Sequence, residues 1–135
     1  MPSQWLKNMA LSKFLDANVL LEILLHRSSY QSTKNMLDKG GDFYFSALSG
    51  HLVFHFSRKV ASRADIRTFL NDYQMQSLTP ADFEWAHQFG DVFGFEDALQ
   101  VAVAVRSGCS EFITFDQKLA RQINKQGIIK ARLLK

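Results

Sequence analysis

Three aspartates lie where the sequence is expected to bring strand ends and a helix start together. Asp16 follows the apolar residues Phe14 and Leu15, and Asp116 follows the run 112–115. Asp97 lies at the start of a stretch with helical spacing of apolar residues. The carboxyl ends of parallel strands border the ligand crevice of an open α/β sheet, so the three carboxylates are expected to converge there. Each also has an ordinary local role, as a turn residue, a first-turn acid and an N-cap respectively.

Carboxylates that converge in this way predict a divalent cation. Like charges held close together raise one another's pKa unless a cation lies among them. Hard oxygen ligands of this kind suit Mg²⁺ or Mn²⁺. Such ions activate water and neutralise the charge that develops on a phosphodiester.

Strands and helices are expected to alternate along the chain, which is the arrangement needed to position these residues. Strands are predicted at 11–16, 42–46, 73–78 and 111–115, with a last extended piece near 128–133. Helices are predicted at 19–26, 30–38, 47–60, 64–70, 80–88 and 96–106, with a short one after Asp116. Asn18 is the expected N-cap of the first helix, and Thr79 that of the helix beginning at Pro80. The alternation favours a parallel sheet covered by helices on both faces.

Length and composition indicate one globular domain spanning residues 1–135, with 47% hydrophobic and 21% charged residues. No apolar run approaches the roughly 18 residues of a membrane span, so no membrane association is expected. The single cysteine, Cys109, excludes an internal disulfide, suits the reducing cytoplasm and is expected to be a small buried packing residue. The N-terminus does not resemble a secretory signal, and Met9 is an alternative start to Met1 because the first strand follows it directly.

The charge is distributed unevenly along the chain. No Lys or Arg lies between 68 and 105, whereas six acidic residues do. From Lys118 onward there are six basic residues and no acid. Lys118, Arg121 and Lys125 are therefore candidate contacts to phosphate, although a solvated helix face explains them almost as well.

The blocks Phe14–Val19, Phe95–Ala104 and Ile113–Asp116 resemble the signature blocks of PIN-domain ribonucleases, and most of all those of VapC-like toxins. The resemblance implies an α/β fold, a three-layer α/β/α sandwich with a mostly parallel central sheet. It also implies Mg²⁺- or Mn²⁺-dependent hydrolysis of RNA by an endoribonuclease, the toxin of a toxin–antitoxin pair. The implied metal-binding and catalytic residues are Asp16, Asp97 and Asp116, with Asn18 and Thr114 as supporting polar residues. A homodimer and an inhibitory antitoxin protein are the implied partners besides RNA.

The chain departs from the family at one position. Many members carry a glutamate on the helix after the second strand, but no acid lies between Ser46 and Ala64 here. Glu96 is a partial substitute beside Asp97, and Glu22 on the first helix is another candidate. His51 and His55 share a helix face by their spacing of four, and apolar neighbours favour packing over metal binding for them.

Two other functions compete with this one. An aspartate-nucleophile phosphotransferase usually needs a second Asp where this chain has Asn18, so it is set aside. A non-catalytic PIN-like module that binds RNA or protein stays open, because the absent glutamate favours it and the three aspartates oppose it.

Overall fold

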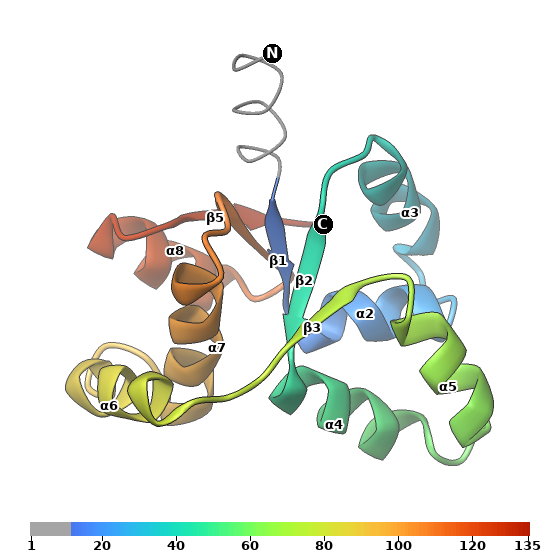
Figure 1. Cartoon of the computed structure of the whole chain (residues 1–135). Coiled ribbons are helices and arrows are strands. Elements are labelled where there is room, and N and C mark those ends of the chain that lie inside the picture. Colours follow the sequence, from blue (N-terminus) through green and yellow to red (C-terminus); the bar gives the residue numbers. More distant parts are fainter. Residues whose placement is uncertain (1–11) are drawn as a thin grey trace, which may run out of the picture.

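The computed structural model describes residues 12–135 (Figure 1), and its centre is a sheet of five parallel strands in the order β3-β2-β1-β4-β5. The strands are β1 (Lys13–Leu15), β2 (Phe43–Ser46), β3 (Gln74–Gln76), β4 (Glu111–Thr114) and β5 (Lys130–Leu133). β1 is the central strand and pairs with β2 on one side and β4 on the other. The expected strand at 11–16 is thus shorter, and its first residue lies outside the described part of the chain, as does Met9.

Seven helices connect the strands in the described part of the chain. They are α2 (Ala17–Leu24), α3 (Tyr30–Asp38), α4 (Ala47–Ser57), α5 (Arg63–Leu70), α6 (Pro80–Phe89), α7 (Phe95–Arg106) and α8 (Gln117–Gln126). Among residues 12–135, no helix has the length and apolar character that a bilayer crossing requires.

The helices cover both faces of the sheet, with α2–α5 on one face and α6–α8 on the other (Figure 1). Successive strand residues point to opposite faces, so Phe14 packs with Phe112 on the α6–α8 side, where their rings stack 5.3 Å apart. The next residues of the same two strands, Leu15 and Ile113, pack on the α2–α5 side. The predicted three-layer α/β/α sandwich is confirmed, and its sheet is entirely parallel.

The helix starts correct one prediction and confirm another. Asn18 is not the N-cap of α2; Asp16 is, because it is the last extended residue and its carboxylate accepts a hydrogen bond from the Ala17 N–H. The predicted start at Thr79 and Pro80 is confirmed, with a capping box between Thr79 and Asp82. Cys109 is buried as expected, and burial raises the pKa of its thiol to about 12.

A buried ion pair holds α6 against α7. Asp82 is 2% exposed and accepts hydrogen bonds from Nε and Nη2 of Arg106 at 2.9 and 3.0 Å. Burial by itself raises the pKa of Asp82, but hydrogen bonds from Arg106 and Thr79 outweigh it and lower the pKa below its ordinary value of 3.8. The pair fixes the position of α7, the helix that carries Asp97.

We expect Arg106→Ala to lower the free energy of unfolding at pH 7 by about 2–3 kcal/mol, because the buried Asp82 carboxylate loses its partner. This is less than for a fully buried pair, since the Arg106 side chain is 34% exposed. The lost stabilisation is present above pH 3.8 and disappears as the pH falls through the lowered pKa of the folded state, so the difference from the parent should shrink in acid. Urea denaturation at pH 7 and pH 3 measures both effects. The exposed Arg121→Ala is the control, with a change within about 0.5 kcal/mol, and equal values for Arg106→Ala and the parent at pH 7 would contradict the prediction.

Candidate active site

Asp16 lies at the carboxyl end of the central strand, and both of its carboxylate oxygens accept hydrogen bonds. Oδ1 accepts from the Ala17 N–H at 2.8 Å, and Oδ2 accepts from the Thr114 hydroxyl at 2.8 Å. Thr114 is the last residue of β4, next to β1 in the sheet, and is fully buried. The strand order therefore places Asp16 beside the end of β4.

Asp116 is joined to Asp16 through the same hydroxyl. Its backbone N–H donates to Thr114 Oγ1 at 3.0 Å, and its carboxylate caps α8 by accepting from the Leu119 N–H at 3.0 Å. A hydroxyl carries one hydrogen and two lone pairs, so Thr114 can serve both aspartates at once. The predicted role of Asp116 as an N-cap is confirmed, and one hydroxyl joins Asp116 to Asp16.

Asp97 approaches the same edge from the first turn of α7. It is partly buried. The N-cap of α7 is Gly94, which has no side chain with which to cap the helix. Burial and the charges of Asp16, Asp116 and Glu96, in that order, raise the pKa of Asp97 to about 6. Carboxylates on three different elements therefore act on one another through space.

The pKa of Asp16 is also raised above its ordinary value. Burial is the main cause, and the charges of Asp116 and Glu96 add to it, while the hydrogen bonds from Thr114 and Ala17 oppose it. Glu96 is exposed but acts on both Asp16 and Asp97. Its charge therefore adds to the repulsion among the aspartates.

The donor set fits a hard divalent cation in chemistry and charge, because every candidate is a carboxylate and their mutual repulsion is what a cation relieves. As they are placed, however, no group of three or more His, Cys, Asp or Glu side chains among residues 12–135 could hold a metal ion. Asp16, Asp97 and Asp116 would have to approach one another to share one.

The remaining candidates take different places. Asn18 is exposed in the first turn of α2. Glu22 is buried and its carboxylate accepts from the Ser29 N–H at 2.6 Å, so it holds the turn before α3. Lys118, Arg121 and Lys125 are exposed on α8, which Asp116 caps.

A buried polar network that the sequence analysis missed lies where the family glutamate is absent. The Ser46 hydroxyl donates to Gln100 Oε1 at 2.6 Å and accepts from the Ser49 N–H at 3.0 Å, and all three residues are buried. Ser46 ends β2 and Gln100 belongs to α7, so the network ties the start of α4 to the helix of Asp97. Its sequence signal is an N-cap serine with a second serine three residues later, but the partner is 54 residues away.

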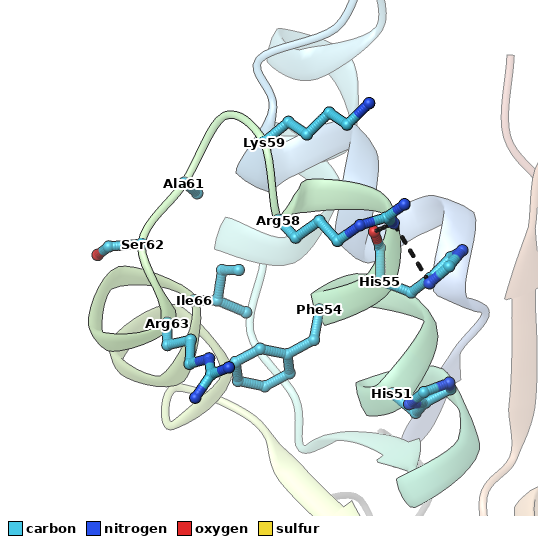
Figure 2. Close-up of a pocket in the computed structure, with 9 residues that line it drawn as sticks. All are labelled: His51, Phe54, His55, Arg58, Lys59, Ala61, Ser62, Arg63 and Ile66. Atoms are coloured by element: carbon cyan, nitrogen blue, oxygen red, sulfur yellow. Dashed lines mark hydrogen bonds between the residues drawn. The ribbon is translucent and has the colours of Figure 1, made fainter.

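His51 and His55 do not pack in the core as expected. Both are exposed, and their rings lie 6.2 Å apart along α4. They line a pocket between α4 and α5 together with Arg58 (Figure 2).

No protein-family model matches the sequence, and no curated protein matches it. Solved structures do match. A chain of the VapBC2 complex from Rickettsia felis, crystallised with a DNA fragment from its promoter, has a TM-score of 0.69 at 12% identity and covers 92% of this chain and 99% of that one. The VapC20 toxin of Mycobacterium tuberculosis, which cleaves the sarcin-ricin loop, has a TM-score of 0.68 at 12% identity and covers 81% and 93%. A chain of a toxin–antitoxin complex from Klebsiella pneumoniae has a TM-score of 0.70 at 18% identity and covers 78% and 88%.

The chain has the fold of VapC toxins. Each of these structures spans more than three quarters of the chain, so the PIN-like resemblance is confirmed for the fold as a whole. Identities of 12–18% concern the fold alone. The activity of this PIN-like chain is therefore argued from its own residues.

The raised pKa of Asp97 predicts how stability depends on pH. Between the ordinary value of 3.8 and about 6, the folded chain binds more protons at Asp97 than the unfolded chain, so this carboxyl makes folding less favourable as the pH rises. We expect Asp97→Asn, in EDTA, to be more stable than the parent at pH 7.5 and to lose that advantage toward pH 4. Chemical denaturation at both pH values measures the difference. Asp91→Asn, at an exposed position between α6 and α7, is the control, and an Asp97→Asn variant less stable than the parent at pH 7.5 would show the prediction to be wrong.

Proposed function

We propose that this chain is an endoribonuclease that hydrolyses RNA phosphodiester bonds with Mg²⁺ or Mn²⁺, and that it is the toxin of a toxin–antitoxin pair. The observation that carries the proposal is the link from Asp16 through the Thr114 hydroxyl to Asp116 at the carboxyl ends of β1 and β4. Burial and the charges of these two aspartates raise the pKa of Asp97, which supports a place for Asp97 in the same site. The fold shared with VapC toxins supports the same reaction class.

Asp16, Asp97 and Asp116 are the residues that would hold the cation. The ion supplies activation of water and neutralisation of charge on the phosphodiester. Thr114 fixes the position of Asp16 by its hydrogen bond, and Asn18 and Glu96 are proposed as polar support.

The partners follow from the same charges. Lys118, Arg121 and Lys125 on α8 begin two residues after Asp116, so a bound RNA strand is proposed to pass over them. An antitoxin is proposed to place an arginine among the carboxylates, because a guanidinium pairs with them bidentately. A homodimer and a cytoplasmic setting complete the proposal.

A specific observation favours a second function. No acidic cluster in the described residues is arranged to hold an ion, and the family glutamate is absent, as in a non-catalytic module that binds RNA or protein. Calorimetric titration with Mn²⁺ distinguishes the two, because a module without catalysis needs no ion site.

We expect Asp97→Asn to abolish RNA cleavage without unfolding the chain, and to remove most of the thermal stabilisation by Mn²⁺. An ion that binds only the folded state stabilises it by about 2.7 kcal/mol at a hundredfold excess over Kd. Fluorescence of a cleavable RNA and a melting curve with and without Mn²⁺ measure the two effects, with Asp91→Asn as the matched control. Cleavage by Asp97→Asn at the parent rate would refute the catalytic assignment, and equal Mn²⁺ shifts in the two proteins would refute a shared ion site.

We expect the double change Lys118→Glu and Arg121→Glu to weaken RNA binding and to leave the Mn²⁺ shift nearly unchanged. Phosphate contacts make affinity fall with salt, so the variant should also show a shallower salt dependence. Anisotropy of a labelled single-stranded RNA across a NaCl series measures both. Arg27→Glu with Lys39→Glu, at exposed positions, is the charge-matched control; unaltered affinity in the α8 variant would make its basic face a solvated surface only.

A further inference from the structure

A pocket of about 570 Å³ lies between the end of α4 and the start of α5. None of its lining residues belongs to the acidic edge, which is made up of Asp16, Asp97 and Asp116. Its apolar part is formed by Phe54 and Ile66, and its basic or imidazole side chains are His51, His55, Arg58, Lys59 and Arg63. In Figure 2 the Arg63 side chain points toward the Phe54 ring, whereas the side chains of His51, His55 and Arg58 extend together from the other side of α4 and Lys59 extends from the turn between α4 and α5. Five residues whose side chains donate hydrogen bonds or carry positive charge are therefore among those that line this pocket.

The lining is free of acid. No Asp or Glu lies between 43 and 64, and the pocket has no carboxylate among its lining residues. The nearest acid in sequence is Asp65, in the first turn of α5, whose backbone N–H donates to the Ser62 hydroxyl at 3.1 Å. The N-terminus of α5 adds the positive end of its dipole to the basic side chains. The pocket therefore suits an anion.

The basic groups are available to a ligand. All five basic and histidine side chains belong to exposed residues. Arg58 is held in place, because its Nη1 lies 3.3 Å from His55 Nδ1 and also donates to the His55 carbonyl. This contact joins the imidazole to a guanidinium at the end of α4, where a row at positions 51, 55 and 58 follows one side of the helix.

The position of α4 connects this pocket to the acidic edge. The helix begins directly after Ser46, whose hydroxyl is bonded to Gln100 on the helix of Asp97. Figure 1 shows α4 running from that point toward α5. Eleven residues at 1.5 Å each give α4 a length of about 16 Å, and His51 lies in its second turn. A chain that leaves the acidic edge along α4 reaches the pocket at the far end of the helix.

We infer that this pocket binds a backbone phosphate of the RNA strand, away from the bond that is cleaved. The inference rests on the proposed function, which supplies the RNA. Single-stranded nucleic acid sites combine cationic groups with aromatic faces, and Phe54 provides such a face next to the basic side chains. An acidic protein segment would meet the same charges but has no base to place on the ring, so RNA is the favoured occupant. The pocket lies on the β2–β3 side of the acidic edge, whereas α8 lies on the β4–β5 side.

The test removes the positive charges of Lys59 and Arg63 and leaves the contact between Arg58 and His55 intact. The Lys59→Gln, Arg63→Gln double variant is compared with the parent and with Arg27→Gln, Lys39→Gln, which removes the same charge at exposed positions outside the pocket. Binding of a labelled single-stranded RNA is measured in EDTA across a NaCl series, and cleavage is measured separately with Mn²⁺. The pocket variant should bind RNA at least several-fold more weakly, with a slope of log Kd against log salt shallower by about 0.7, since each phosphate contact to a single strand contributes about that much. The control pair should keep the parent slope, and melting curves should coincide.

The outcomes separate the two proposals. If the parent cleaves RNA and the pocket variant binds RNA as the control pair does, the inference about the pocket is wrong and the ribonuclease proposal is unaffected. A parent that neither binds nor cleaves RNA would overturn both. Binding of a poly-glutamate peptide that depends on Lys59 and Arg63, with RNA affinity unchanged in the same variant, would replace RNA by an acidic protein segment and overturn the inference.

Discussion

The hydroxyl of Thr114 is the contact on which the acidic edge depends. It donates to Asp16 at 2.8 Å and accepts from the Asp116 N–H at 3.0 Å, and the residue is fully buried. Its single hydrogen fixes the direction of both bonds, because the N–H of Asp116 can only donate. Asp16 must therefore accept, which favours its ionised form against the effect of burial. Two strands separated by almost a hundred residues are aligned by this one side chain, and the parallel pairing of β1 with β4 makes it possible.

The three carboxylates are supported unequally. Hydrogen bonds from Thr114 and Ala17 oppose the effect of burial at Asp16, whereas at Asp97 burial and three neighbouring carboxylates all act in the same direction. The structure thus concentrates negative charge where local interactions do least to stabilise it. The ion pair between Asp82 and Arg106 holds the other end of α7 against α6. Under the proposed function, a cation would relieve the repulsion among the three carboxylates.

The sequence predicts the layers better than the details of the site. Alternating strands and helices are enough for a parallel sheet with two helical layers, and each aspartate follows or opens an element that the local pattern defines. The sequence predicts Asn18 as the N-cap of α2 because it lies two residues after the aspartate that ends the strand and directly before an apolar run. In the structure β1 ends at Leu15 and α2 begins at Ala17, so Asp16 takes that role. The apolar neighbours of His51 and His55 predict packing for both, but α4 buries only Val53 and three small residues, and the two rings are exposed. The bond from Ser46 to Gln100 joins residues 54 apart, and no local pattern contains it.

The distribution of charge around the edge constrains how a polyanion can bind under the proposed function. Asp16, Asp97 and Asp116 repel phosphate until a cation is present, while the pocket at the end of α4 and the basic face of α8 attract it on either side. Contacts of the RNA with these two basic surfaces therefore bring a phosphate to the three carboxylates, whose charge opposes its binding when no ion is present. Binding free energies are reciprocal, so if the ion raises the affinity for RNA, RNA raises the affinity for the ion by the same factor. This coupling also concerns the missing glutamate. With one carboxylate fewer, the site repels RNA less in the absence of metal. It also binds the ion with fewer protein ligands, so ion binding depends more on the RNA.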